Sequence, residues 1–375
     1  MSGLRRERMV PRVDWRRRAE EIGFSFHTAG GVPYWDESAC YALTADGVDL
    51  LEAATNDLEQ ACLALVDRVV GRGEYDRLRI DDASAALIDA SWKRGDRNLV
   101  GRFDLAWDGV GPPKMMEYNA DTPTALFEAA VVQWEWLETV KKGADQFNSI
   151  HERLIEAWPH IGARDGVHFA CVRDHAEDFG TTEYLRDTAT QAGLETAFLH
   201  IDEIGWNGLG FLDLDDRPIK TLFKLYPWEW LMREGFAEHI GPSKVQMIEP
   251  AWKMILSNKA VLPLLSELYP DHPNLLPASF DPAAIRGPKV RKPILGREGA
   301  NVAIVEDGAT VAESDGPYGE EGFVYQALHP LPDFDGAHPV IGSWVIASQS
   351  AGIGIREDSG PITRDTSRFV PHYFA

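Results

Sequence analysis

GRFDLAWDGVGPPKMMEYNADTPT, residues 101–124, is the stretch of sequence that decides our interpretation of the fold. Alternating polar and apolar residues predict a strand over Arg102–Asp108, and a second strand is expected over Lys114–Asn119. The intervening DGVGPP has the composition of a tight turn, so the two strands should form a hairpin. Strict alternation places Arg102, Asp104, Ala106 and Asp108 on one face of the first strand. On the second strand it separates Met115, Glu117 and Asn119 from Met116 and Tyr118.

Carboxylate and amide oxygens dominate one face of this predicted hairpin. The pairing can bring Asp104 beside Glu117 and Asn119, with Arg102 one pleat away. Mg²⁺ takes few protein oxygens and keeps water or phosphate in its other positions. An arginine on the same face suits the stabilisation of charge in phosphoryl transfer. A polar face that merely meets solvent would show the same spacing, although the surrounding aromatic and apolar residues are typical of a half-buried strand.

Length and charge limit the functional classes. A chain of 375 residues predicts two or three domains. Its formal net charge of −22 argues against a nucleic-acid or anionic-membrane partner and is compatible with a cationic substrate. Cys40, Cys62 and Cys171 lack metal-binding spacing, so we expect reduced cysteines in the core and a cytoplasmic protein. No apolar run approaches a membrane span, and the basic N-terminus lacks the apolar region of a secretory signal.

Three long helices are predicted in the first part of the chain, after a short one over Asp14–Glu21. Apolar residues recur at helical spacing over Asp46–Val70, a helix that Thr44 or Asp46 can cap, and further helices are expected over Ile80–Lys93 and Pro123–Lys142. Proline suits the first turn of the third long helix. Thr122 and Thr124 would then lie at its N-terminus, either as ordinary caps or beside an anionic group favoured by the helix dipole.

In the middle of the chain, the predicted elements alternate between strand and helix. A strand at Val167–Val172, a helix at Thr181–Ala192 and a strand at Glu195–His200 predict a βαβ unit in a small parallel sheet. Because no glycine-rich phosphate loop follows the first strand, we do not expect a dinucleotide-binding domain. Leu209–Leu214 and Ile219–Leu225 are predicted to form a hairpin.

Two lysines and a glycine loop stand out in the last third. Lys292 lies on a predicted strand and is followed at once by the loop 296–301, an arrangement that can cover nucleotide phosphates. Lys259 lies near a helix start, and Glu229 is a candidate amine-binding acid, although a surface glutamate would look the same. The backbone at the end of Phe323–Leu328 could pair with an adenine edge. Other expected elements are helices over Pro227–Glu238 and Glu249–Tyr269 and strands over Val290–Ile294, Asn301–Val305, Val340–Ser348 and Gly352–Arg356.

Together these parts resemble the glutathionylspermidine synthetase family, and the phrases EYNADTPT, LSNKAVLP, RKPILGREGANV and IREDSGPITRDTSRFVP carry the resemblance. The resemblance covers almost the whole chain and is strongest to stand-alone bacterial proteins without an amidase domain. It implies an ATP-grasp fold of mixed α+β and α/β character, with a rotated motif order in which the metal ligands precede the lysines. The ATP-grasp core would comprise residues 1–125 and 245–375, and residues 126–244 would form a small βαβ pre-ATP-grasp-like domain.

The activity implied by the resemblance is Mg²⁺-dependent, ATP-using amide ligation. A carboxylate of a small molecule or peptide is phosphorylated to an acyl phosphate, which an amine such as a polyamine then attacks. The implied ligands of two Mg²⁺ ions are Asp104, Glu117 and Asn119. The implied catalytic arginine, which stabilises the transferred phosphoryl group, is Arg102.

The resemblance also implies a nucleotide site and a substrate site. The nucleotide-binding residues would be Arg102, Asp104, the lysines Lys259 and Lys292, the lid residues Gly296, Arg297, Glu298 and Gly299, and the hinge residues Tyr325, Gln326, Ala327 and Leu328. The residues near the acid or the amine would be Thr122, Thr124, Glu229, Arg356 and Asp365. Two other functions fit the same residues: a nucleotide- or polyamine-binding protein without turnover, and a kinase acting on a small molecule.

Overall fold

A five-stranded antiparallel sheet occupies the centre of the computed structural model, which describes residues 2–163, 165–364 and 367–375 and is a mixed α/β fold. The strand order is β20-β19-β18-β5-β6, so strands from both ends of the chain share one sheet. Their bounds are Val100–Ala106 (β5), Lys114–Asn119 (β6), His338–Ile346 (β18), Gln349–Asp358 (β19) and Arg368–Val370 (β20).

The predicted hairpin of β5 and β6 is present, but its second strand contains a β-bulge. Asp104 lies opposite Glu117, whereas Leu105 lies opposite Met115, so Met116 is an extra residue. Because a bulge adds one residue to a strand, the side chains that precede it point to the face opposite to the one expected from strict alternation. Met115 therefore joins the core and Met116 faces the same cavity as Glu117, which corrects the strict alternation expected for this strand.

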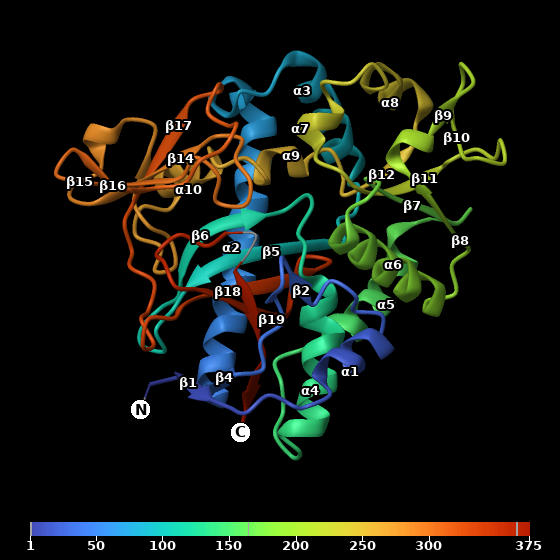
Figure 1. The fold of residues 1–375 in the computed structure, drawn as a ribbon. Coiled ribbons are helices and arrows are strands. Elements are labelled where there is room, and N and C mark those ends of the chain that lie inside the picture. Colours follow the sequence, from blue (N-terminus) through green and yellow to red (C-terminus); the bar gives the residue numbers. More distant parts are fainter. Residues whose placement is uncertain (1, 164, 365–366) are drawn as a thin grey trace.

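Long helix α2 (Ala45–Arg72) packs on the central sheet, as Figure 1 shows. The hydroxyl of Thr44 accepts a hydrogen bond from the backbone N–H of Gly47 and caps the helix, one of the two caps that the sequence allows. On the buried face, Thr55 and Ser343 share a 2.6 Å hydrogen bond that joins α2 to β18. Helix α3 (Asp82–Arg94) follows after the 3-10 turn η1 (Glu74–Leu78).

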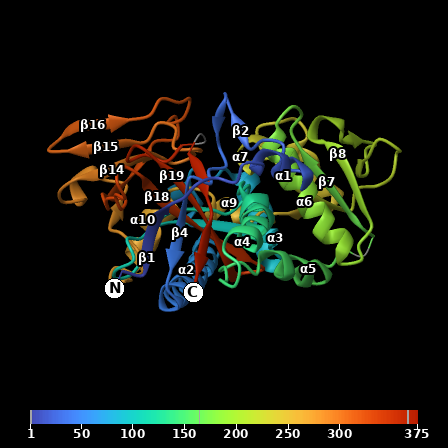
Figure 2. The same cartoon turned by 60° about the horizontal axis from the view of Figure 1, so that its bottom comes forward.

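A four-stranded parallel sheet lies on one side of the central sheet, in the green and yellow part of Figures 1 and 2. This confirms the predicted βαβ unit of β7, α6 and β8. The predicted hairpin at 209–225 is present only near its turn, where the backbone N–H groups of Ile219 and Asp213 donate to the oxygens of Phe211 and Arg217. The rest of its second strand is β11, which pairs in parallel between β7 and β12. The bounds are Ile150–Ile161 (α5), Val167–Cys171 (β7), Ala176–Gln191 (α6), Thr196–His200 (β8), Ile201–Glu203 (η3), Gly205–Trp206 (β9), Phe211–Leu212 (β10), Thr221–Leu225 (β11), Trp228–Leu231 (α7), Ala237–Ser243 (α8) and Gln246–Ile248 (β12).

A second five-stranded antiparallel sheet, in the order β13-β17-β14-β15-β16, lies on the opposite side of the central sheet (Figures 1 and 2). Helix α10 packs against its strands β13 and β17. The helix predicted over 249–269 is divided into α9 and α10, and the helix predicted over 227–238 is likewise interrupted between α7 and α8. The bounds are Lys253–Leu256 (α9), Val261–Leu268 (α10), Ala278–Ser279 (β13), Pro282–Ala284 (η4), Lys289–Pro293 (β14), Ala303–Glu306 (β15), Ala309–Glu313 (β16) and Phe323–Ala327 (β17).

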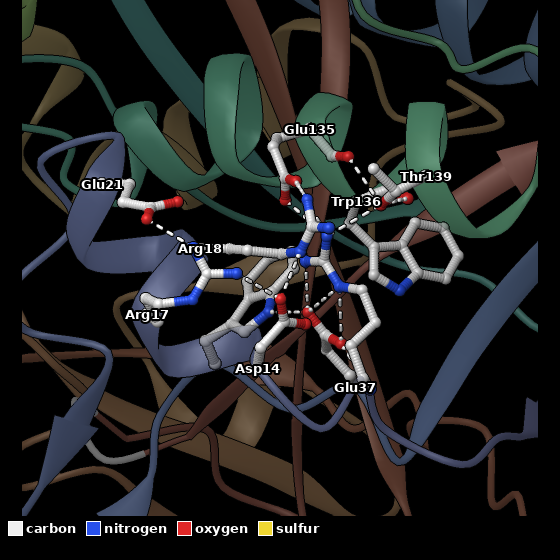
Figure 3. Close-up of polar contacts among 10 residues, drawn as sticks. Asp14, Arg17, Arg18, Glu21, Glu37, Glu135, Trp136 and Thr139 are labelled. Carbon is white, nitrogen blue, oxygen red and sulfur yellow. Dashed lines mark hydrogen bonds and ion pairs between the residues drawn. The ribbon is translucent and has the colours of Figure 1, made fainter.

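The N-terminal segment is fixed by strands and by an ion-pair cluster. The small sheet β1-β4-β21 brings both ends of the chain together. Arg12 bonds to Glu37 at 2.6 Å and to Glu135 at 2.7 Å, and Figure 3 shows Arg18 beside Glu135 in the same cluster. The cluster thereby joins this segment to α4. The bounds are Leu4–Arg8 (β1), Trp15–Glu21 (α1), Thr28–Ala29 (β2), Val32–Pro33 (β3), Ala39–Leu43 (β4), Glu128–Val132 (the π-helix η2), Gln133–Val140 (α4) and His372–Phe374 (β21).

The cysteines and the lengths of the apolar helices bear on two expectations about the whole chain. All three cysteines are buried and unpaired, as expected for reduced core cysteines. In the described part of the chain, no helix combines the length and the apolar character needed to cross a bilayer.

Candidate active site

A cavity of about 680 Å³ lies where the central sheet meets the two flanking sheets. Its wall includes Arg102 and Asp104 from β5, Glu117 from β6, Lys292 from β14 and Arg356 from β19. Charged residues that are distant in sequence therefore face one space.

Asp104 is held between two arginines. Its Oδ1 accepts a 2.8 Å hydrogen bond from Arg102 Nε, and its Oδ2 accepts one of the same length from Arg356 Nη2. Arg102 also donates to the backbone oxygen of Thr124 at 2.6 Å. The side chains of Arg102 and Asp104 are each only 7% exposed, so this face of the hairpin is enclosed rather than a solvated strand face.

Glu117 faces the two lysines. Its Oε2 lies 3.1 Å from Lys259 Nζ, and its Oε1 accepts a 3.4 Å hydrogen bond from the Asn119 amide. Burial opposes ionisation of Glu117, but the charges of Lys259 and Lys292 outweigh burial and lower its pKa to about 2. The hairpin face therefore carries an ionised carboxylate directly opposite Asp104.

Lys292 is fixed by the bulge and by a glutamine. Its Nζ donates to the backbone oxygen of Met116 and to Gln326 Oε1, both at 2.7 Å. Burial lowers the pKa of Lys292 to about 8, and Glu117 partly offsets that effect. Lys259 Nζ donates to the backbone oxygen of Gly296 at 2.6 Å, which connects the other lysine to the glycine loop.

The donor set of the hairpin fits a hard cation. Asp104, Glu117 and Asn119 offer carboxylate and amide oxygens, the ligand type that Mg²⁺ accepts. Among residues 2–163, 165–364 and 367–375, no group of three or more His, Cys, Asp or Glu side chains is arranged to hold a metal. These three residues could therefore supply only part of a coordination shell, with phosphate and water oxygens in the remaining positions.

The segment 121–125 is irregular, which corrects the helix predicted from Pro123. Buried Asp121 accepts hydrogen bonds of 2.8 Å from Lys224 Nζ and from the backbone N–H of Trp228. Ala125 follows with φ +66°, so helical structure begins only at Leu126. Thr122 and Thr124 line the cavity but do not lie at a helix N-terminus.

The glycine loop is tied to the opposite wall by Arg297. This arginine donates to Glu229 Oε1 at 2.8 Å and to the Thr122 hydroxyl at 2.6 Å. The Arg297 charge lowers the pKa of Glu229 against the opposing effect of burial. Glu229 is thus paired with the loop. Arg297, Glu298 and Gly299 line the cavity, whereas Gly296 and Glu229 line a smaller pocket that shares Arg297 with it.

The four predicted hinge residues differ in position. Leu328 lines the cavity, whereas Tyr325, Gln326 and Ala327 lie in β17 between β13 and β14. The backbone N–H groups of Ala327 and Leu328 donate to Pro277 and Pro288, so these two amides are already used. Asp365, the remaining predicted residue, lies outside the described residues.

Sequence reasoning missed one end of the cavity. Tyr34, Glu177 and Asp178 line it, and burial raises the pKa of Asp178 to about 6. Two acidic residues at the start of α6 look like an ordinary N-terminal turn, and no local pattern marks Tyr34. Only the packing of distant elements identifies these residues.

The chain is similar to known proteins over nearly its whole length. The profile of the family described as glutathionylspermidine synthase preATP-grasp matches residues 6–375. A Haemophilus influenzae protein named as an acid–amine ligase is 43% identical over 385 residues, which cover 97% of each chain. Trypanothione synthetase of Crithidia fasciculata is 34% identical over 313 residues, covering 75% of this chain and 48% of that enzyme. In fold, the chain is similar to a glutathione synthetase-like effector of Globodera pallida, with a TM-score of 0.55, 12% identity and 89% coverage of each chain.

Proposed function

The chain belongs to the glutathionylspermidine synthase family, and from this membership and the cavity we propose that it is an ATP-dependent ligase joining a carboxylate to an amine. The observation that carries the proposal is the convergence of Lys259, Lys292 and Arg102 with the oxygen-bearing hairpin face. Phosphoryl transfer needs such cations around the triphosphate, with oxygen ligands for a metal beside them. The acid would be activated as an acyl phosphate, and the amine would then displace phosphate.

We infer that ATP lies between the lysine-bearing sheet and the hairpin. Val290, Ile304 and Leu328 pack together on the cavity wall and form an apolar surface suited to adenine. Tyr325, Gln326 and Ala327 lie in β17, which pairs with β14. Lys259 and Lys292 would contact the phosphates, and the loop 296–301 would cover them, with Arg297 nearest. Bound Mg²⁺, in our proposal two ions held by Asp104, Glu117 and Asn119, would neutralise phosphate charge.

The opposite end of the cavity suits the two other substrates. Arg102 and Arg356 present guanidinium groups that can bind a carboxylate, with the Thr122 and Thr124 hydroxyls nearby. Glu177 and Asp178 make the far wall acidic, which favours an ammonium group such as that of a polyamine. Glu229 would become available to the amine only if its bond to Arg297 opened.

We also propose the ATP-grasp architecture with a rotated order of motifs. The hairpin with the proposed metal ligands precedes the lysine-bearing sheet in sequence, and residues of both line the cavity. The ATP-grasp core would include residues 1–125 and most of 245–375. Because β12 pairs with β11, we place the end of the pre-ATP-grasp-like domain at residue 248 rather than 244.

An ADP-release assay with a panel of acids and amines tests the function. A ligase makes ADP only with an acid present, and mass spectrometry detects an amide when an amine is added. A kinase would leave a stable phosphorylated product, and a binding protein would make neither.

Glu117→Gln should abolish ADP release without unfolding the chain, because it removes a carboxylate from the metal-binding face. Glu267→Gln is the matched control, since Glu267 is half exposed and pairs with Arg77 outside the cavity. Wild-type rates in Glu117→Gln would contradict the assigned role of this carboxylate.

A further inference from the structure

Tyr34 and Glu128 form a buried pair at the wall of the cavity. The Tyr34 hydroxyl donates a 2.8 Å hydrogen bond to Glu128 Oε1, and Tyr34 lines the cavity. The Glu128 side chain lies behind it at 0% exposure, and its second oxygen, Oε2, has no hydrogen-bond partner among the residues that the structure describes. A buried carboxyl oxygen without a partner is costly, so this pair calls for an explanation beyond packing.

The backbone fixes the pair beside the two arginines of the site. Phe369 donates its N–H to the backbone oxygen of Tyr34 at 2.8 Å, and Phe369 lies opposite Arg356 in the β19–β20 register. Glu128 begins the π-helix η2, four residues after Thr124, whose backbone oxygen accepts the Arg102 hydrogen bond. Single π-helical turns are frequent at functional sites. The pair therefore belongs to the same wall as the groups assigned to the acid.

Electrostatics keep the tyrosine neutral and make the glutamate titratable. Burial raises the pKa of Glu128 to about 8, assisted by Glu177 and opposed by the Tyr34 hydrogen bond and Arg102. Burial also raises the pKa of Tyr34, assisted by Glu128 and Glu177 and opposed by Arg356. A carboxyl that exchanges its proton near working pH is suited to general-base catalysis.

Amide formation creates a need for such a group, because an alkylammonium ion has no free electron pair. Resting on the ligase function proposed above, we propose that Tyr34 is a catalytic residue that takes a proton from the ammonium nucleophile and passes its own proton to Glu128. The ammonium N–H bond breaks, the Tyr34 O–H bond is re-formed, and Glu128 Oε1 gains the proton. Glu128 acts through Tyr34.

The rest of the reaction then balances. The neutral amine attacks the acyl carbon, a C–N bond forms, and the C–O bond to phosphate breaks. The remaining excess proton on nitrogen leaves with the phosphate, giving hydrogen phosphate. Glu128 returns its proton to solvent after the products have left.

Hydroxylamine separates this proton transfer from the first half-reaction. It is mostly unprotonated at neutral pH, so it can trap an acyl phosphate as a hydroxamate without a base. The assay compares hydroxamate formation with amide formation from spermidine, using the acid that gives most hydroxamate in the wild type. Tyr34→Phe and Glu128→Gln should lower amide formation about 10²–10⁴-fold at pH 7 while hydroxamate formation stays within about threefold.

A pH series supplies a readout that a purely structural role would not change. In both variants the deficit with spermidine should shrink as pH rises toward the amine pKa, since solvent then provides neutral amine. Tyr41→Phe is the matched control, because Tyr41 donates a buried 2.7 Å hydrogen bond to Glu357 and does not line the cavity. That control should retain both activities.

The outcomes are distinguishable. Equal loss of hydroxamate and amide in the two variants, or a deficit that does not change with pH, would overturn the proton relay while leaving the ligase function intact. Unchanged amide formation in Tyr34→Phe would overturn it as well. A wild-type chain that makes ADP, hydroxamate and amide from none of the acids would instead overturn the proposed function.

Discussion

Replacing Arg102 with alanine tests whether the central arginine acts in the reaction or only in the fold. Arg102 makes a 2.8 Å hydrogen bond to Asp104 and a 2.6 Å hydrogen bond to the backbone oxygen of Thr124. Stranding a buried charge typically costs about 3–5 kcal/mol. Because Arg356 still pairs with Asp104 in the variant, we expect the free energy of unfolding to fall by a smaller amount, about 2–4 kcal/mol.

The expected fall in kcat of Arg102→Ala is larger than the loss of folded protein alone would produce. If the guanidinium stabilises charge as the phosphoryl group moves, its removal should lower kcat by on the order of 10²–10³. The dissociation constant of ATP should change much less, because the interaction is strongest in the transition state. Arg102→Lys should restore little of the rate, since an ammonium group cannot form the planar two-pronged contact.

The assay measures kcat per folded molecule, ATP affinity and denaturant unfolding on the same preparations. Arg12→Ala is the matched control, because Arg12 is 14% exposed and bonds to Glu37 and Glu135 in the cluster of Figure 3, outside the cavity. It should lose comparable stability and keep its kcat. A kcat for Arg102→Ala within about threefold of wild type, together with the expected loss of stability, would show that Arg102 only holds the hairpin.

Three further predictions concern the loop and the buried glutamate. Gly299→Ala should weaken ATP binding in a titration more than Gly308→Ala does, because both have positive φ but only at Gly299 would a Cβ meet another group, 2.4 Å from the oxygen of Thr363. Hydrogen exchange in the loop 296–301 should slow when MgATP is added, and equal protection with and without it would argue against a lid. The pKa of Glu128 is raised from 4.5 to about 8, so the stability that its protonation contributes to the wild type should be complete below pH 4.5 and be lost as pH rises through 8. Urea unfolding of Glu128→Gln should show a flatter profile across that range.

Local sequence signals were sufficient for the elements whose stability is local. The apolar spacing of α2 and its threonine cap predict a helix that the structure confirms as Ala45–Arg72. Alternation and turn chemistry likewise predict a hairpin that brings Asp104 beside Glu117 and Asn119, and in the structure Asp104 lies opposite Glu117. In both cases the pattern and the hydrogen bonds arise within one helix or one hairpin.

Tertiary contacts decided the features that the sequence did not reveal. The proline and threonines at 122–124 favour a helix start, but the buried pair of Asp121 and Lys224 fixes an irregular segment instead. The bulge at Met116 presents its backbone oxygen to Lys292, 176 positions away in the chain. Tyr34 reaches the cavity because its backbone pairs with Phe369. Each of these contacts joins residues far apart in the sequence, so a short stretch of neighbouring residues cannot predict it.

The pairing of β5 with β18 has a consequence for synthesis of the chain. One edge of β5 pairs with β6 in the adjacent hairpin, but the other edge pairs with strand residues Ile341–Ile346. At translation rates of about 5–20 residues per second, that edge waits roughly 12–50 s for its partner to leave the ribosome. An unpaired strand edge is prone to join other chains. The nascent chain should therefore depend on chaperones while β5 is exposed, and nucleotide binding should begin only after β18 has emerged.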